Sequence, residues 1–537
     1  MTVQGQSRSP VQTGRFPVRP WADYVCIGLI ILGGGLRIYH WLQDHSLWLD
    51  ESYLAVNILD RGFGSLHLPL EYSQSAPYLF LVATKCVVSI FGPSEFALRA
   101  VPLTASLLSL WVFWRLAKET LPKLVVPVVL AIISFAYEPL SHAPELKQYS
   151  TEIFLTTLVA WQTARLFRHP EAPQRCFVAL FVTGSLAIFA AHPMPFVLAG
   201  AGLAALWARH RRVLRLPYAW LFLAIAAWLA LFLVNYLVIL RPVYTDPVIG
   251  KYWVFAYPGR SATLAGLRSW FVLGTDYLSY LGYANAFKVL VAAALLGGAG
   301  FAWRTRHLAT LAAMVTAGTY WLAALAGRAP FHGRLILFLF PLLLLVIGKG
   351  LEWLIAAGPR WIFALAAGAL LVPTVARLPQ AIDIEAKEDL RAPIVFLARA
   401  RAPAEPVYVE FWAQPAFQYY RRARSLSRLF PPVVEFGHDD RNFSPATRAG
   451  APPEVSPDTG RIVSELARLV PERKFWVLVA HFDENRIQLL RRIHDVLGLT
   501  PLITYRATGS SLYYFDAANA GAMDAANRQN EPPGRSS

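Results

Sequence analysis

The stretch Ser46-Leu-Trp-Leu-Asp50-Glu51-Ser-Tyr53 places two adjacent acidic residues just beyond an apolar segment, Trp21 to Tyr39. Aromatic residues flank the two acids, as they do at a membrane–water boundary. Acidic residues near a bilayer are costly and tend to be functional when they face a cavity. The stretch alone fits a second interpretation equally well, in which Asp50 caps a short surface helix that starts at Glu51.

The composition indicates a membrane protein. Of the 537 residues, 55% are hydrophobic and only 16% are charged, whereas an ordinary soluble domain has roughly 25% charged residues. Apolar runs of about 20 residues recur along the chain, which predicts a polytopic α-helical membrane protein. Most Arg and Lys residues behind the net charge of +16 lie in short loops between these runs. No basic stripe lies on a soluble module, so we expect no nucleic-acid partner.

The apolar segment 76–92 decides the predicted topology. We expect about 11 spans between residues 21 and 378 by the length criterion, after a cytoplasmic tail at 1–20. If 76–92 crosses the membrane, the basic loops between later spans fall outside. If it is a juxtamembrane or re-entrant piece, they fall inside, as the positive-inside rule prefers. We adopt the second interpretation, which places these loops on one outer face: 40–75, 139–150, 241–284 and 327–334.

The character of the sequence changes after about residue 378. Ile384–Ala400 has an amphipathic helical pattern, and alternating strand and helix signals continue to residue 516. This pattern predicts a small α/β domain at 379–516, outside the membrane. The polar composition of 517–537 predicts a disordered tail. The sequence has no Walker loop or dinucleotide fingerprint, so any donor group must come from something other than a bound nucleotide.

Three motifs occur in order along the first part of the chain. They are Leu47-Trp-Leu-Asp50-Glu51-Ser-Tyr53, then Phe91-Gly-Pro-Ser-Glu95-Phe-Ala-Leu-Arg99, and then Ser141-His-Ala-Pro-Glu145-Leu-Lys147-Gln-Tyr149-Ser150. Together they resemble the integral-membrane GT-C glycosyltransferases, the superfamily of protein O-mannosyltransferases and lipid A aminoarabinose transferases. The resemblance covers roughly residues 21–378. Gly333-Arg334-Leu335 to Pro341 is similar to a late Arg-Tyr…Pro motif of that superfamily, with Leu in place of Tyr.

The resemblance implies transfer of a sugar from a polyprenyl-phosphate-linked donor to an acceptor outside the cytoplasmic (inner) membrane, with inversion. Such a reaction needs a carboxylate that deprotonates the acceptor and cations that steady the departing phosphate. The resemblance implies Asp50 as the general base, with Glu51 as its catalytic neighbour. Glu145 takes the family's second acidic position, for the acceptor or for a metal.

We further expect cationic contacts to the donor phosphate, and other polar contacts from the loops. The phosphate-binding candidates are Lys147, Arg334 and Arg37, and the loop candidates are Gln74, Tyr149 and His332. Many relatives carry Lys where this chain has Gln74, so Lys147 is expected to replace that contact. Asp50 and Glu145 together would favour Mg²⁺ or Mn²⁺ over zinc, and the resemblance leaves metal use open.

Simpler interpretations exist for most of these residues. Glu145 and Lys147 are also explained as the start of the next span, and Arg334 as an interfacial anchor. Arg37 is also explained by snorkelling to headgroups, and His192 as a turn residue.

Two other functions compete with the enzyme. A transporter or flippase of lipid-linked glycans is less favoured, because the sequence has no internal repeat and the acids lie at a membrane face. A surface-polysaccharide polymerase or ligase would share the donor lipid. The sequence does not identify the acceptor among lipid, glycan and protein.

Overall fold

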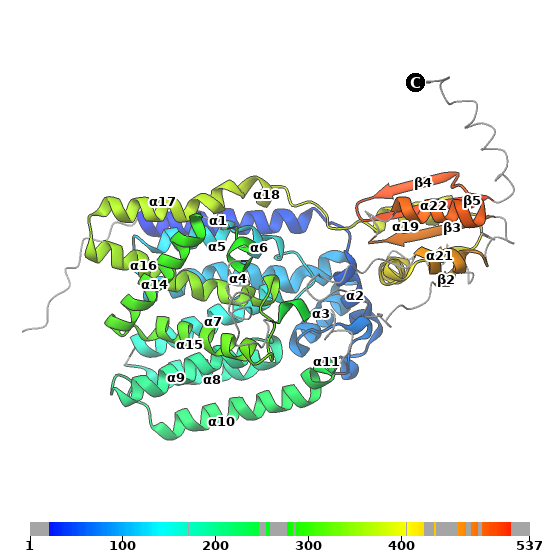
Figure 1. Ribbon diagram of the computed structural model, residues 1–537. Coiled ribbons are helices and arrows are strands. Elements are labelled where there is room, and N and C mark those ends of the chain that lie inside the picture. The colour runs from blue at the N-terminus through cyan, green and yellow to red at the C-terminus, as the bar shows by residue number, and fades with distance from the viewer. Residues whose placement is uncertain are drawn as a thin grey trace, which may run out of the picture.

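The computed structural model describes the chain from residue 21 to residue 516, with gaps. The described residues are 21–169, 171–245, 254–257, 276–282, 286–403, 405–423, 434–436, 459–468, 474–481 and 486–516. The predicted tails 1–20 and 517–537 and most of the loop 241–284 lie outside them. Figure 1 shows a long bundle of helices with a small α/β domain at one end.

A helix occupies each span that the sequence predicts. These helices are α1 (Trp21–Leu42), α4 (Glu95–Thr120), α5 (Val126–Phe135), α7 (Tyr149–Arg168), α8 (Pro173–Ala190), α9 (Met194–His210), α10 (Tyr218–Asn235), α14 (Ala286–Thr305), α15 (Leu308–Leu325), α16 (Phe340–Ala357) and α17 (Arg360–Ala376). Within the described ranges, seven are long and apolar enough to cross a membrane by length and composition: α1, α4, α8, α10, α14, α15 and α16. The chain is therefore a multi-pass membrane protein, as predicted. Since α5, α7, α9 and α17 are shorter or more polar, the count of about 11 spans stays a prediction.

Close helix packing explains some of the small residues in these segments. A Cβ atom on Gly298 of α14 would lie 1.9 Å from the carbonyl oxygen of Val346 in α16. Only glycine allows the two backbones to approach this closely, which is a common device between membrane helices.

The first outer loop contains α2 (Leu49–Asp60) and two short 3₁₀ turns, Phe63–Ser65 and Glu71–Ser73. The sequence predicts a surface helix at this place, but most residues of α2 are buried, and the residue that precedes the helix is Trp48, not Asp50. Next comes α3 (Tyr78–Phe91), within the segment 76–92. Its 14 residues rise about 21 Å, less than the roughly 30 Å hydrocarbon core of a bilayer. This length agrees with a juxtamembrane or re-entrant segment, although its depth in a membrane remains a prediction.

The basic loops and the acidic loop lie at opposite ends of the bundle. Lys118 donates to Asp23 at 2.9 Å, so α4 ends beside the start of α1. Arg168 lies 3.8 Å from Glu119, which brings the end of α7 to the same place. Because the 22 residues of α1 rise about 33 Å, the loop that follows it, with Asp50, lies at the other end.

The C-terminal part forms a five-stranded mixed sheet. Its strands are β1 (Val407–Val409), β2 (Val434–Phe436), β3 (Lys474–Ala480), β4 (Ile503–Ala507) and β5 (Ser510–Asp516), in the order β2-β1-β3-β5-β4. β1 pairs in parallel with β2 and β3, whereas β5 pairs antiparallel with β3 and β4. The accompanying helices are α19 (Arg391–Ala400), α20 (Gln414–Ala423), α21 (Thr459–Leu466) and α22 (Arg486–Leu497). The predicted small α/β domain is therefore present.

The helix predicted at Ile384–Ala400 begins only at Arg391. The residues before it, 383–390, form an irregular connection that we call the strap. It follows the short helix α18 (Leu378–Ile382). The helical prediction failed for the strap because its charged side chains bind the first outer loop, as described below.

One hydrophobic cluster joins the small domain to the first outer loop. It contains Leu54 and Ile58 from α2, Phe80 from α3, and Val407 and Trp476 from the sheet. Burial of apolar side chains is the dominant favourable term in folding and in association. The small domain is therefore packed onto α2 (Figure 1), the helix that carries the two acids.

Candidate active site

Asp50 lies at the start of α2 and faces two cationic side chains that come from distant parts of the sequence. Arg334 donates to the Asp50 carboxylate at 2.6 Å, and the Lys147 ammonium lies 3.9 Å from the same oxygen. Arg334 follows α15, in a 3₁₀ turn at Gly333–Leu339, and Lys147 precedes α7. The two motifs that the sequence separates by almost 200 residues thus meet at one carboxylate.

Asp50 and Arg334 line a cavity of about 310 Å³. Its polar lining includes Gln74, Gln148 and Tyr149 from the predicted loops. The remainder is mostly aromatic or aliphatic and comes from many elements: Leu49, Tyr53, Tyr72, Pro193, Phe196, Leu240, Val243, Tyr257, Tyr320, Leu335, Phe411 and Trp412. A mostly apolar pocket with a few convergent polar groups is the usual form of a small-molecule site.

The backbone is strained where the first loop reaches the cavity. Tyr72 and Ser73 both line it with φ angles of 59° and 50°, a region that non-glycine residues seldom adopt. The ring of Tyr72 stacks on Tyr53 of α2, with centroids 4.7 Å apart, which holds the turn in place. Strained backbone persists only where the surrounding structure fixes it, and such residues cluster at functional sites.

The electrostatics of the site keep Asp50 ionised. Burial on its own would raise the pKa of Asp50, but Lys147 and Arg334 outweigh it and hold the pKa below the usual aspartate range. The guanidinium of Arg334 also stacks near two rings, 5.4 Å from the centroid of Trp48 and 5.6 Å from that of Tyr149. Lys147 donates to Gln74 at 2.9 Å. Both cations are therefore fixed in direction and remain close enough to the cavity to meet an anion.

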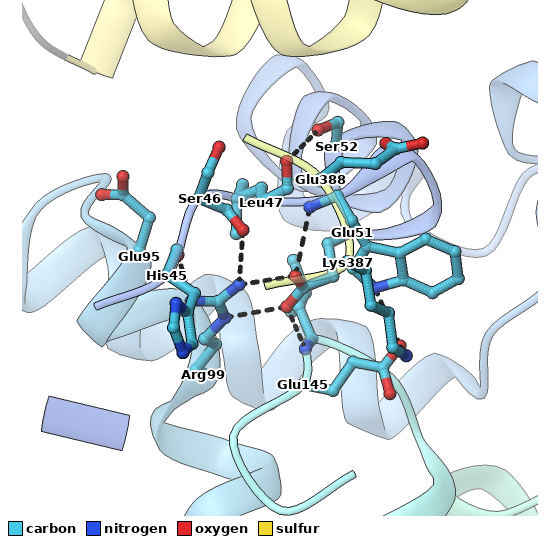
Figure 2. Close-up of polar contacts among 12 residues, drawn as sticks. His45, Ser46, Leu47, Glu51, Ser52, Glu95, Arg99, Glu145, Lys387 and Glu388 are labelled. Carbon is cyan, nitrogen blue, oxygen red and sulfur yellow. Dashed lines mark hydrogen bonds and ion pairs between the residues drawn. The ribbon is translucent and has the colours of Figure 1, made fainter. Parts of the chain in front are cut away.

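Glu51 has a different environment from its neighbour. Its carboxylate accepts from Arg99 at 2.8 and 2.5 Å and from the backbone N–H of Leu146 at 2.7 Å. Glu51 is 1% exposed, and the described lining of the cavity does not include it. Figure 2 shows Arg99 reaching Glu51 from one side, with the Glu145 loop beside it. In this geometry Glu51 connects α2 to Arg99 and to the loop at Leu146, and its carboxylate does not face the cavity.

Glu145 is also occupied by neighbouring side chains. It accepts from the indole N–H of Trp48 at 2.9 Å, pairs with His142 and lies 3.1 Å from the ammonium of Lys387 in the strap. Burial would raise the pKa of Glu145, but Lys387 and His142 hold it well below its usual value. Glu145 therefore fixes Trp48, which in turn lies against Arg334.

The strap also binds the start of α2 directly. Trp48, the residue before α2, has no side-chain oxygen for the free backbone N–H groups of the first helical turn. Glu388 supplies one by accepting from the N–H of Leu49 at 2.9 Å, and its other oxygen lies 2.6 Å from His481 at the end of β3. Because a capping acceptor stabilises a helix start, the strap and the small domain help to set the position of Asp50.

Two predicted residues lie elsewhere. Arg37 is buried in α1 and donates to Ser106 and to the backbone carbonyls of Gly33, Ile133 and Ser134 at 2.8 to 3.1 Å. It thus binds the free carbonyls where α5 ends, and the structure does not bring it to the Asp50 cavity. His332 packs edge-on against Phe255, with centroids 5.0 Å apart, just before the turn that carries Arg334. The described cavity lining includes neither residue.

The structure also brings in residues to which the sequence assigned no role. Arg99 ends the second motif, so its place in that motif was the available signal. Lys387 and Glu388 were hidden inside a helical pattern. His192, interpreted as a turn residue, lines the cavity together with Glu152 of α7.

A divalent cation at the predicted pair, Asp50 and Glu145, stays a prediction. Among the described residues, no group of three or more His, Cys, Asp or Glu side chains could hold a metal ion. Asp50 and Glu145 each face cationic side chains already, so a divalent cation there would have to compete with Lys147, Arg334 and Lys387. We therefore derive no step through a metal.

Comparisons with known proteins agree with the resemblance to membrane glycosyltransferases. Residues 75–237 match the family model of the dolichyl-phosphate-mannose-protein mannosyltransferases, while no curated protein has a significant match. The oligosaccharyltransferase of Archaeoglobus fulgidus aligns over 92% of this chain and 74% of its own, at 11% identity and a TM-score of 0.52. ArnT from Cupriavidus metallidurans aligns over 92% of this chain and 99% of its own, at 15% identity and a TM-score of 0.49. Similarity at this level of identity concerns the fold. The chain is thus a multi-pass membrane protein with the fold of the GT-C glycosyltransferases, the superfamily that its loop motifs resemble.

Proposed function

We propose that this protein transfers a sugar from a polyprenyl-phosphate-linked donor to an acceptor on the outer face of the cytoplasmic membrane, with inversion. The observation that carries the proposal is the meeting of one ionised carboxylate and two cations at the edge of one cavity. Asp50 lies 2.6 Å from Arg334 and 3.9 Å from Lys147. A base and an anion-binding pair are the groups that such a transfer needs.

Several features support a lipid-phosphate donor. The matched family model is named for dolichyl-phosphate mannose, and the oligosaccharyltransferase AglB, which shares the fold, has been solved with an inhibitory peptide and a dolichol-phosphate. The cavity offers apolar walls next to fixed cations, which suits a ligand that joins a prenyl chain to a phosphate. Arg334 and Lys147 differ in kind, and a guanidinium is suited to grip two phosphate oxygens at once.

The donor phosphate would change the state of Asp50. Without it, both cations pair with the carboxylate and lower its pKa, which makes Asp50 a weak base. A phosphodiester competes for Arg334 and Lys147, so the carboxylate loses part of this stabilisation and becomes more basic. The base is thus strengthened only when the donor is in place.

The chemical step then balances as follows. The acceptor oxygen attacks the anomeric carbon from the side opposite the phosphate and forms the new glycosidic bond. The bond between that carbon and the phosphate oxygen breaks, and its electron pair stays on the phosphate, near Arg334 and Lys147. The proton of the acceptor hydroxyl passes to Asp50. A positioned general base of this kind contributes about 10²- to 10⁴-fold in rate.

Glu51 and Glu145 act in this proposal as positioning residues. Glu51 ties α2 to Arg99 and to the backbone of Leu146, next to Lys147. Glu145 fixes Trp48, whose ring lies against Arg334. The orientation rests on charge, because the basic loops share the end of the bundle that lies opposite Asp50, and basic loops prefer the cytoplasm.

The test is sugar transfer in membranes that contain the full chain and a radiolabelled polyprenyl-phosphate sugar, mannose first. We expect Asp50→Asn to lose about 10²- to 10⁴-fold in transfer rate. Asp23→Asn is the matched control, because Asp23 is an exposed acid at the opposite end of the bundle, and it should transfer at the wild-type rate. Unchanged transfer by Asp50→Asn would contradict the assignment of the base. No transfer by the wild type from any donor would favour a flippase of lipid-linked glycans.

A further inference from the structure

One buried carboxyl group in the cavity wall, that of Glu152, lacks a partner side chain within the described part of the chain. Glu152 of α7 lines the cavity and is 4% exposed. The backbone N–H of His192 donates to it. Among the described residues, no side chain forms a hydrogen bond or an ion pair with its carboxylate. Glu152 has no part in the reaction proposed above.

The other acids of this region show how unusual this is. Asp50 faces Arg334 and Lys147, Glu51 faces Arg99, and Glu145 faces Lys387 and His142. Burying a carboxylate costs several kcal/mol unless it is paired or hydrogen-bonded. Among the described residues, the carboxyl group of Glu152 has only the backbone N–H of His192 as a partner, and it lines the cavity. This points to a partner that arrives with the ligand.

The surroundings of Glu152 favour a polar, uncharged or cationic ligand group rather than a phosphate. His192 lies beside it, and its Nε2 atom is 3.3 Å from the hydroxyl of Ser75. Burial lowers the pKa of His192 to about 4, so the imidazole is neutral at pH 7. Since a neutral imidazole and a carboxyl group offer no positive charge to attract an anion, the phosphate belongs with Arg334 and Lys147.

The spacing of residues along α7 fits one sugar ring between the phosphate site at Arg334 and the carboxyl group of Glu152. Tyr149, whose ring lies 5.6 Å from the Arg334 guanidinium, is three residues before Glu152 on the same helix face. Three residues of α-helix rise about 4.5 Å, which is close to the width of a hexose ring. A donor whose phosphate meets Arg334 would therefore bring its sugar to Glu152.

We propose that Glu152 and His192 form the subsite for the transferred sugar, with Glu152 accepting hydrogen bonds from donor groups on the ring. The inference rests on the proposed function. The ligand must offer a hydrogen-bond donor to the carboxyl group of Glu152. This donor is either a hydroxyl of a neutral sugar or the ammonium of an amino sugar. Phe196 and Tyr320, which pack edge-to-face at 5.0 Å in the same wall, offer the apolar surface that a sugar ring also needs.

The test measures binding of three lipids to the purified full chain in detergent micelles. The lipids are undecaprenyl phosphate, the same lipid with mannose, and the same lipid with an amino hexose. Wild type is compared with Glu152→Gln, which keeps shape and one acceptor oxygen, and with Glu152→Leu, which removes both. Undecaprenyl phosphate has no sugar, so it serves as the control for folding and for the phosphate site.

We expect the wild type to bind one sugar-bearing lipid more tightly than the sugar-free lipid. Glu152→Leu should lose at least about 10-fold in affinity for that lipid and should bind undecaprenyl phosphate as the wild type does. If the sugar is neutral, Glu152→Gln should stay within about 3-fold of wild type, since it still accepts a hydrogen bond. If the sugar carries an ammonium, Glu152→Gln should lose as much as Glu152→Leu, because the charge is gone.

Three results would overturn the sugar subsite. They are equal wild-type affinity for sugar-bearing and sugar-free lipids, wild-type affinity of Glu152→Leu for the sugar-bearing lipid, and an equal loss of all three lipids in both variants, which would give Glu152 a structural role. Failure of the wild type to bind any of the lipids would instead contradict the proposed function itself.

Discussion

Asp50 and Glu51 are neighbours in the sequence, yet they belong to two different regions of the molecule. Asp50 opens onto the cavity and faces cations that a ligand can take over. Glu51 points the other way, into a closed cluster with Arg99 that Figure 2 displays. Successive residues of a helix point about 100° apart, so one turn of α2 can serve both regions. Two acids in one motif therefore need not share one role.

The two regions differ in whether a ligand could replace the partners of the acidic residue. The cluster around Glu51 is saturated by Arg99 and the backbone of Leu146. The carboxylate of Asp50 is held by Arg334, which lines the cavity, and by Lys147 next to it. The first arrangement suits a fixed support, and the second suits a group whose surroundings change when a ligand binds.

The largest expected effect on stability is in the closed cluster. Glu51→Leu leaves the Arg99 guanidinium buried without its carboxylate, and breaking a buried pair costs about 3–5 kcal/mol. We expect a strong drop in melting temperature and in the yield of folded protein, measured by thermal unfolding in detergent. The double variant Glu51→Leu/Arg99→Leu should recover part of the loss, because no uncompensated charge is then buried. A Glu51→Leu variant that melts like the wild type would show that the cluster is not a support.

A smaller effect is expected at the strap. Glu388→Gln keeps an acceptor for the Leu49 N–H but removes the charge that faces His481. Hydrogen bonds to charged groups are worth about 1.5–3 kcal/mol, so Glu388→Ala should lower stability by about that much and Glu388→Gln by less. Both should also slow transfer per folded molecule, since α2 carries Asp50. Equal melting temperatures and transfer rates in the wild type, Glu388→Gln and Glu388→Ala would show that the strap and the small domain do not help to position Asp50.

Features of the fold and the site that depend on residues close together in the sequence were predictable, whereas those that depend on contacts between distant residues were not. The membrane segments follow from local runs of apolar residues, and Asp50, Arg334, Lys147, Gln74 and Tyr149 follow from motifs that the resemblance interprets. The orientation of Glu51 was not predictable, because it depends on Arg99, 48 residues away. Arg37 was misplaced for a similar reason, since its partners are carbonyls at the end of α5. The amphipathic pattern predicted a helix for the strap, but its tertiary contacts override that pattern.

The smallest expected effect concerns pH. A carboxyl group whose pKa is lowered in the folded protein stays ionised to lower pH, so its contribution is present above the ordinary aspartate pKa and is lost as pH falls through the lowered value. Lys147 and Arg334 lower the pKa of Asp50. The acid limb of kcat/KM, which reports the free enzyme, should therefore lie below about pH 4.

Removing one of the two cations sharpens this prediction. Arg334→Gln should move the acid limb to higher pH by about one unit, or about 1.4 kcal/mol, in addition to weakening the donor. The limb is read from transfer rates at low donor concentration between neutral and acidic pH. An acid limb that stays in place in Arg334→Gln would mean that a group other than Asp50 sets it.

The most direct test of the account compares Asp50→Asn and Glu51→Gln, two nearly isosteric changes at adjacent positions. Both purified proteins are assayed for sugar transfer per folded molecule and for melting temperature. The account predicts that Asp50→Asn lowers the melting temperature less than Glu51→Gln does, because the Asp50 side chain is 21% exposed and that of Glu51 is 2% exposed, and that it loses about 10²- to 10⁴-fold in transfer. It predicts that Glu51→Gln loses stability and retains more transfer per folded molecule than Asp50→Asn. A stable Glu51→Gln without transfer, beside an active Asp50→Asn, would contradict the account and make Glu51 the reacting carboxylate.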